Sequence, residues 1–249
     1  MIFIYILIGI IQGLTEFLPV SSSGHILLVS EIFNIDCDIV FLSVVAHLGT
    51  LLSVLICMRK KISYCLTHPL CSTNKKLIIS TLPCVIFVLL FKDLVDKLYS
   101  VYFLIVGFLI TGILLIVADI LANKTQKITY KHSLVMGIMQ GVAILPGISR
   151  SGSTMAVGML AGANKNEACD FTFLMSIPII IASAIFESIE MFTQGLNIEI
   201  FPMIVVFLTS FIFGILSIKL MIKTLKNNKL YAFSIYLTVL AIITLFVAK

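Results

Sequence analysis

Long apolar runs separated by short polar stretches dominate the chain. A membrane-spanning helix needs about 20 predominantly apolar residues, and the alternation of apolar and polar positions that is typical of barrel strands is absent. The pattern therefore predicts an all-α polytopic membrane protein with six transmembrane helices. The expected spans are residues 39–58, 77–91, 101–121, 169–189, 200–222 and 230–248.

Two further apolar regions, 1–33 and 133–163, are interrupted by polar and helix-breaking residues. Pro19 and the serines after it divide the first region, and Pro146 and a Ser/Gly-rich stretch around Arg150 divide the second. Each region has the pattern of a helix, a break and a second helix, with both helices too short to cross a bilayer. We expect two re-entrant helix hairpins that enter the membrane and return on the same side.

The composition narrows the class of protein. Hydrophobic residues make up 60% of the 249 residues, charged residues only 12%, and the mean hydropathy is +1.16. A soluble domain has about a quarter charged residues, so this chain has too few charges to cover a water-facing surface. A soluble enzyme, a nucleic-acid-binding domain and a disordered chain are excluded, and no nucleic-acid partner is expected. None of the six cysteines forms a CxxC pair, which makes a disulfide framework or zinc site improbable.

The distribution of the 17 basic residues supports this layout. Loops 59–76, 122–132 and 219–229 contain most of them, and six spans with two hairpins place all three loops on one side. Basic loops mark the cytoplasmic side. Treating either interrupted region as a full span would break this asymmetry.

The order of elements indicates an internal repeat within one membrane domain, residues 1–249. Each half, 1–122 and 131–249, has a hairpin followed by three spans, so the second half is inverted relative to the first. Gln-Gly dipeptides at 12–13 and 140–141 precede the proline of each hairpin. In inverted repeats, broken helices meet near the midplane and form the site there, so we expect the two hairpin tips to face each other.

The second hairpin contains a candidate anion site around Arg150. An arginine at membrane depth is costly, and its planar guanidinium fits phosphate oxygens. The stretch resembles a loop that leads into a helix, whose N-terminal N–H groups and dipole favour anions. Alternatives are an ion pair between Arg150 and Glu16, and simple helix capping by the hydroxyls. The hydroxyl residues expected to bind phosphate are Ser149, Ser151, Ser153 and Thr154.

The first hairpin contributes groups of a different kind. Gln12 and Glu16 are four residues apart and share a helix face, and Ser22 and His25 are three apart and can share another. A hydroxyl or a water could attack phosphorus while His25 or Glu16 moves protons. Alternatively, Glu16 could hold Mg²⁺ or Ca²⁺ that bridges phosphate oxygens. His25 could also be a hydrogen-bonded structural residue. His47, inside the first span, is given no role.

The stretches 12–25 (QGLTEFLPVSSSGH) and 146–154 (PGISRSGST) resemble the two signature motifs of the undecaprenyl-diphosphate phosphatase, or bacitracin-resistance, family. The resemblance implies hydrolysis of undecaprenyl diphosphate to undecaprenyl phosphate and inorganic phosphate. This reaction recycles the lipid carrier of peptidoglycan synthesis and confers bacitracin resistance. It also implies a divalent cation, Mg²⁺ or Ca²⁺, a location in the bacterial cytoplasmic membrane, and a site open to the outer (periplasmic) face.

The family motifs carry over residue by residue. They imply catalytic roles for Glu16, Ser22, His25 and Arg150, with Ser22 as the preferred nucleophile activated by His25 and direct water attack as the rival. Glu16 is the expected metal ligand, and Gln12, where some members have glutamate, weakens a two-carboxylate metal site.

The expected partners are a polyprenyl diphosphate lipid and the bilayer, and a homodimer is left open. The main alternative function is a secondary transporter or lipid flippase, since inverted repeats with broken helices are common there. A purely structural scaffold is the third.

Overall fold

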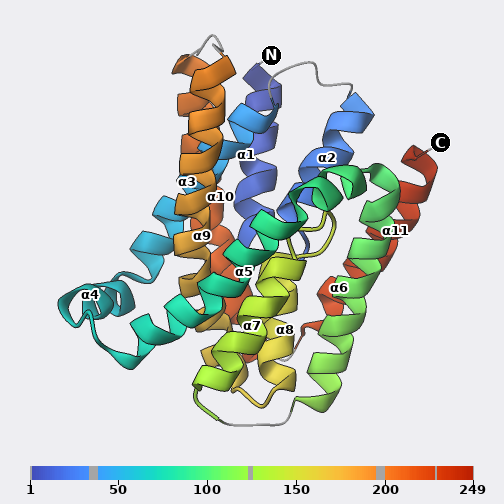
Figure 1. The fold of residues 1–249 in the computed structure, drawn as a ribbon. Helices are drawn as coiled ribbons and strands as arrows, with labels where there is room; N and C mark the ends of the chain where they lie inside the picture. The colour runs from blue at the N-terminus through green and yellow to red at the C-terminus, as the bar shows by residue number, and fades with distance from the viewer. Residues whose placement is uncertain (1, 34–38, 123–125, 195–199, 228, 249) are drawn as a thin grey trace.

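The computed structural model describes residues 2–33, 39–122, 126–194, 200–227 and 229–248. Within these ranges the chain is helical, and pairing of the β type is limited to one isolated bridge between Gln126 and Ala163. The helices are α1 Ile2–Phe17, α2 Ser22–Phe33, α3 Ile39–Cys57, α4 Arg59–Thr67, α5 Ser72–Leu98, α6 Val101–Leu121, α7 Tyr130–Val142, α8 Arg150–Leu160, α9 Lys165–Gln194, α10 Ile200–Lys226 and α11 Tyr231–Val247 (Figure 1).

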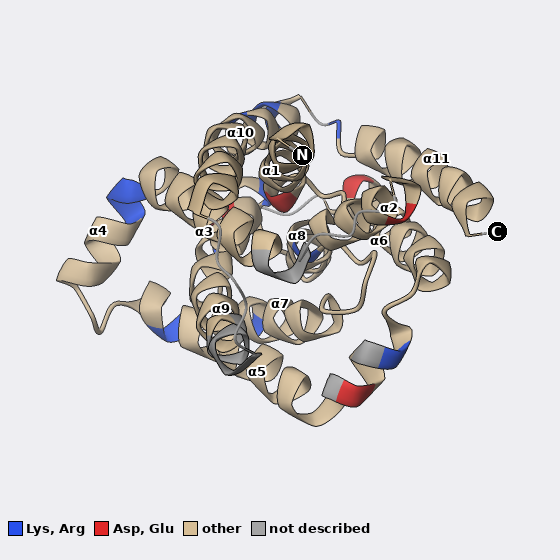
Figure 2. Cartoon of the chain, turned by 90° about the horizontal axis from the view of Figure 1, so that it is seen from above, with Lys and Arg blue, Asp and Glu red and all other residues tan. Residues whose placement is uncertain are grey.

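Four helices are long and apolar enough to cross a bilayer: α6 and α10 in full, and α5 and α9 over Ser72–Phe91 and Lys165–Phe186. A fifth candidate span is the bent pair α3–α4, whose parts meet at 81°. α11, expected to be a span over 230–248, has 17 residues, close to the shortest length that crosses a bilayer. The protein is therefore an all-helical, multi-pass membrane protein with four to five candidate spans by length and composition. Figure 2 shows how few positions carry charge.

The basic loop expected at 59–76 contains a helix, α4, instead of irregular chain. Its first turn is Arg59-Lys60-Lys61, and Tyr64 and Leu66 are exposed beyond it. Because α4 turns by 81° from α3, it projects to the side and lies at the left edge of the molecule (Figures 1 and 2). Lys60 and Lys61 thus belong to an ordered element.

The two interrupted regions fold as helix pairs, α1–α2 and α7–α8. The outer ends of α1 and α2 lie at the upper edge of Figure 1, those of α7 and α8 lie at the lower edge, and both breaks lie near mid-height. Each break contains a residue with positive φ, Ser21 at 69° and Gly147 at 82°. This conformation costs little for glycine and more for serine. Gly147 also lies so close to α6 that a Cβ there would be 2.7 Å from the Leu104 carbonyl oxygen.

The helices pack in matched pairs. α1 packs on α10 as α7 packs on α5, α2 lies against α11 as α8 lies against α6, and α3 contacts both α9 and α10. Seen from above, α8 lies near the middle of the molecule, and α4, α5 and α11 lie at its edge (Figure 2). Small residues permit the closest approaches, as expected between helices in lipid. A Cβ on Gly13 would be 2.7 Å from the Ser210 carbonyl oxygen of α10. This close contact lies about one turn before Glu16 and holds the last part of α1 against α10.

Candidate functional site

A cavity of about 300 Å³ lies where the two hairpin breaks meet. The end of α1, the start of α2, the break before α8 and parts of α3 and α9 form its wall. Hydroxyl groups, one carboxylate, one guanidinium and one imidazole face it alongside apolar side chains. The polar side chains of its lining are Thr15, Glu16, Ser21, Ser22, Ser23, Ser43, His47, Tyr99, Ser149, Arg150, Ser151 and Ser183.

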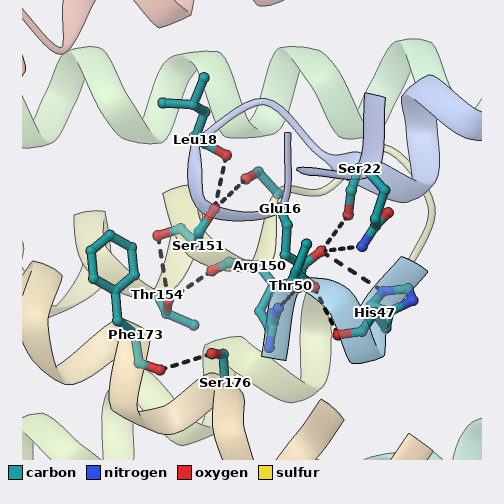
Figure 3. A network of polar contacts seen from close by, with 12 residues as sticks. Glu16, Leu18, Ser22, His47, Thr50, Arg150, Ser151, Thr154, Phe173 and Ser176 are labelled. Atoms are coloured by element: carbon teal, nitrogen blue, oxygen red, sulfur yellow. Dashed lines mark hydrogen bonds and ion pairs between the residues drawn. The ribbon is translucent and has the colours of Figure 1, made fainter. Parts of the chain in front are cut away.

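Glu16 is the centre of the polar network in this cavity (Figure 3). Its side chain is 2% exposed and forms an ion pair with Arg150 through Oε1. Its other oxygen, Oε2, accepts hydrogen bonds from Ser22 Oγ at 2.8 Å and from Gln12 Nε2 at 2.9 Å. The structure therefore brings together Gln12, Glu16, Ser22 and Arg150, four of the residues that the sequence selected.

Arg150 is the first residue of α8, and only part of its guanidinium group is hydrogen-bonded within the described residues. Its Nη2 contacts Glu16, whereas Nη1 is buried and has no hydrogen-bond partner among the described residues. A buried guanidinium N–H without an acceptor is costly, so this position is suited to an anionic ligand. The ion pair with Glu16, the alternative raised from the sequence, also forms, and it leaves half of the guanidinium fork available.

The hydroxyl residues around Arg150 separate into two groups. Ser149 and Ser151 line the cavity. Ser149 Oγ also caps α8 by accepting from Gly152 N at 3.1 Å, and Ser151 Oγ donates to the Leu18 carbonyl at 2.9 Å, which joins the two hairpin breaks. Ser153 and Thr154 lie outside the cavity lining.

Thr154 Oγ1 donates to the Arg150 carbonyl at 2.7 Å, and Ser153 Oγ contacts the same carbonyl at 3.5 Å. Both side chains are buried within the α8 packing. Their part in phosphate binding stays a prediction, and their geometry favours support of the helix over direct contact.

His25 does not pair with Ser22 in the structure. Its Nδ1 donates to the Ser21 carbonyl at 2.7 Å, and its Nε2 lies 2.6 Å from the Tyr236 hydroxyl of α11. Because a carbonyl can only accept, the neutral imidazole carries its proton on Nδ1 and accepts from Tyr236 at Nε2. The hydroxyl of Ser22 is directed instead to Glu16. His25 therefore stabilises the turn before Ser22 through its bond to the Ser21 carbonyl.

His47, which the sequence analysis left without a role, occupies the cavity. Its Nε2 lies 3.7 Å from Glu16 Oε2, and its Nδ1 lies 2.7 Å from the Ser43 carbonyl, to which it donates. An ionisable side chain within an apolar span is the signal that could have selected it. Its distance from Glu16 depends on how α3 packs against α1, which the sequence does not reveal.

The amino-acid sequence of the chain matches a family of known proteins. The family model described as bacitracin resistance protein BacA matches residues 5–243, which include both hairpins. An undecaprenyl-diphosphatase of Carboxydothermus hydrogenoformans is 35% identical over 244 residues, covering 95% of this chain and 94% of the relative. The undecaprenyl-diphosphatase 4 of Bacillus cereus is 37% identical over 245 residues, covering 96% and 94%. The undecaprenyl-diphosphatase of Borrelia recurrentis is 36% identical over 249 residues, covering 93% of each chain.

The chain belongs to the BacA family. The resemblance drawn from the two motifs is thereby confirmed at the level of the whole chain, since the match extends well beyond residues 12–25 and 146–154.

The divalent cation expected of a BacA family member can be tested against the donor atoms of the site. Among the described residues, no group of three or more His, Cys, Asp and Glu side chains could hold a metal. Glu16 supplies one carboxylate, and the neighbouring Gln12 Oε1 is buried and has no hydrogen-bond partner. Mg²⁺ is commonly held by one or two carboxylates together with substrate phosphates. Glu16 and Gln12 therefore fit a cation that takes its other ligands from a diphosphate.

Proposed function

We propose that this protein is an undecaprenyl-diphosphate phosphatase, which converts undecaprenyl diphosphate into undecaprenyl phosphate and inorganic phosphate. The observation that carries the proposal is the buried Nη1 of Arg150, which has no hydrogen-bond partner among the described residues, at a cavity lined by serines. The names of the relatives, with 35–37% identity over nearly the whole chain, support it. Such a reaction would recycle the lipid carrier of peptidoglycan synthesis and explain resistance to bacitracin.

Arg150 and the start of α8 bind the terminal phosphate in this proposal. Nη1 donates to one phosphate oxygen, the hydroxyls of Ser149 and Ser151 lie beside it, and the positive end of the α8 dipole adds to the attraction. Phosphoryl transfer depends mainly on such positioning and on stabilisation of charge. The guanidinium shifts part of its interaction from Glu16 to the substrate, which leaves the carboxylate freer to accept a proton.

Ser22 is the proposed nucleophile, and Glu16 is the acceptor of its proton. Ser22 Oγ attacks the terminal phosphorus, the bond from that phosphorus to the bridging oxygen breaks, and undecaprenyl phosphate leaves. Water then hydrolyses the phosphoserine and releases phosphate. The 2.8 Å hydrogen bond from Ser22 to Glu16 supports this assignment over activation by His25, whose ring nitrogens are engaged elsewhere. Direct attack by water remains the rival route.

A divalent cation, Mg²⁺ or Ca²⁺, is proposed to bind at Glu16 and Gln12. When bound, it would neutralise the negative charge of the diphosphate. His47 is positioned to orient Glu16 from the α3 side, at 3.7 Å.

The proposed topology is six transmembrane helices and two re-entrant hairpins in an inverted repeat, residues 1–122 and 131–249. The paired contacts α1–α10 and α7–α5 support it, as do the basic loops 59–76 and 122–132, whose Lys60, Lys76 and Lys127 line one cavity at the basic end of the molecule. In this topology the basic end faces the cytoplasm, and the cavity opens to the outer side of the bacterial cytoplasmic membrane. The homodimer stays a prediction.

Phosphate release from undecaprenyl diphosphate by the purified protein in detergent tests the proposal. We expect release that requires Mg²⁺ or Ca²⁺ and that stops with a chelator. Lys223→Ala, at an exposed position of α10, is a control that should behave as the wild type. Absence of release with every cation, together with movement of the lipid across vesicles, would instead establish a flippase.

A further inference from the structure

A second cavity, of about 460 Å³, lies at the basic end of the molecule and shares no lining residue with the site above. It is formed by α4, the start of α5, the segment before α7 and the start of α9. Its lining has four lysines and two carboxylates, together with the apolar side chains of Ile128, Phe171 and Leu174. The lining residues that matter here are Lys60, Lys61, Lys76, Lys127, Glu167 and Asp170.

The charge of this cavity is only partly balanced. Lys61 forms an ion pair with Asp170, and the Lys76 ammonium lies 5.7 Å from the centre of the Tyr130 ring. Lys60 and Lys127 have no carboxylate within ion-pair distance among the described residues. Two lysines from separate segments of the chain are therefore available in this cavity to bind an anion.

An apolar hollow of about 140 Å³ adjoins this basic cavity, since Cys65 and Leu174 line both. Its wall is almost entirely aliphatic, which suits hydrocarbon better than a water-soluble anion. The hollow is lined by Ile62, Leu66, Leu77, Ile177 and Pro178, besides Asn74 and the two shared residues.

The turn and the composition of α4 are those of a helix at the membrane interface. α4 turns by 81° from α3 at the end of the span, begins with three basic residues and exposes Tyr64 and Leu66, which are 54% and 77% accessible. A short helix with basic and aromatic residues that turns away from the end of a span is typical of a membrane interface. Basic pockets between spans at that level bind anionic headgroups.

We propose that these two hollows form a binding site for an anionic phospholipid. The lipid phosphate lies between Lys60 on α4 and Lys127 ahead of α7, and the first part of one acyl chain occupies the aliphatic hollow between α4, α5 and α9. Such a lipid would join α4 to α9, whose Ile180 lines the phosphatase cavity farther along the helix. The site does not depend on the proposed phosphatase activity.

Lipid binding to the full-length protein in a neutral detergent provides the test. We expect phosphatidylglycerol to bind, measured by native mass spectrometry, and to raise the melting temperature, whereas phosphatidylcholine does neither. The variant Lys60→Gln/Lys127→Gln should bind phosphatidylglycerol at least about tenfold more weakly. The matched control Lys223→Gln/Lys226→Gln removes the same charge from exposed positions of α10 and should bind like the wild type.

Two further arms separate the sources of phosphate. Inorganic phosphate and glycerophosphoglycerol, which lack acyl chains, should not compete with phosphatidylglycerol at equal concentration. Effective competition by either would overturn the lipid site in favour of a site for free anions. Equal weakening in both lysine pairs, or equal binding of phosphatidylcholine, would likewise refute it.

Discussion

The two hairpins have the same backbone plan and opposite chemistry. Each is a pair of short helices with a proline and a positive-φ residue in the break. The α1–α2 hairpin contributes the carboxylate of Glu16 and the hydroxyl of Ser22, whereas the α7–α8 hairpin contributes the guanidinium of Arg150. Neither charge is balanced within its own hairpin, and the ion pair between them is formed only when the tips meet. The site is therefore a property of the contact between hairpins.

The glutamines at matching positions extend this comparison. Gln12 and Gln140 each precede a glycine in the first helix of a hairpin, and both are buried. Gln12 donates to Glu16, whereas the Nε2 of Gln140 has no partner among the described residues. The amide at this position therefore donates a hydrogen bond in the first hairpin only. This difference is consistent with two hairpins of common origin whose polar contacts have diverged.

Removing the charge of the second hairpin should have the largest effect. Arg150→Ala loses the phosphate contact and leaves Glu16 buried without its cation, so we expect phosphate release to fall by about a thousandfold or more and stability to fall by about 3–5 kcal/mol. Arg150→Lys should restore little activity, because an ammonium lacks the planar fork. Phosphate release and thermal unfolding measure the two effects. Wild-type turnover in Arg150→Lys would contradict the role of the fork.

Removing the hydroxyl of the first hairpin should have the next largest effect. Ser22→Ala deletes the proposed nucleophile, and we expect turnover to fall at least about 100-fold with unchanged folding. Ser23→Ala, at a neighbouring serine of the same cavity, is the matched control and should keep most activity. A phosphoserine trapped by rapid acid quench in the wild type would support the covalent route. Full activity of Ser22→Ala would leave direct water attack as the mechanism.

A substitution at His25 separates proton transfer from positioning. Asparagine can offer an N–H near the place of Nδ1, so His25→Asn retains the bond to the Ser21 carbonyl and loses the one to Tyr236. If His25 supports the turn, turnover should fall by only about fivefold, the equivalent of one hydrogen bond, and Tyr236→Phe should behave similarly. A loss of 100-fold or more in His25→Asn, with Tyr236→Phe active, would restore His25 as the base. Steady-state phosphate release at saturating lipid makes the distinction.

The smallest effect is expected at the unused glutamine. Gln140→Met removes a buried amide N–H that has no partner among the described residues, so turnover should stay at the wild-type level and the free energy of unfolding should rise by about 1 kcal/mol or stay the same. Gln12→Met, in contrast, should weaken the response to Mg²⁺ or Ca²⁺. The cation concentration that gives half-maximal phosphate release measures this difference. Equal loss in both variants would show that the hairpins are less different than the contacts indicate.

Much of this arrangement could be predicted because polar residues at membrane depth are rare. That rule selected Glu16 and Arg150, and the breaks follow from Pro19 and Pro146, which interrupt a helix. The ion pair between Arg150 and Glu16 was one of two alternatives that the sequence left open. The contact from His25 to Tyr236 joins residues 211 positions apart and depends on how α2 packs against α11, which hydropathy does not encode. The place of His47 depends in the same way on the packing of α3.

The helix α4 was missed for a different reason. A run beginning with Arg59, Lys60 and Lys61 has the charge of a solvated loop, and the structure forms a helix there directly after the bend that ends α3. The basic residues of this segment therefore predicted a loop where the structure has a helix, and the side of the membrane that they indicate stays a prediction.

The hydrogen bond from Ser151 to the Leu18 carbonyl has a consequence for permeability. In the proposed topology the two hairpins enter the bilayer from opposite faces, so their polar breaks would bring water to the same depth from both sides. The Ser151 bond and the Glu16–Arg150 pair join the two tips at this depth, and in that topology the joined tips would close the path for water. A protein that handles a charged headgroup in the middle of the membrane can in this way avoid leaking protons and ions.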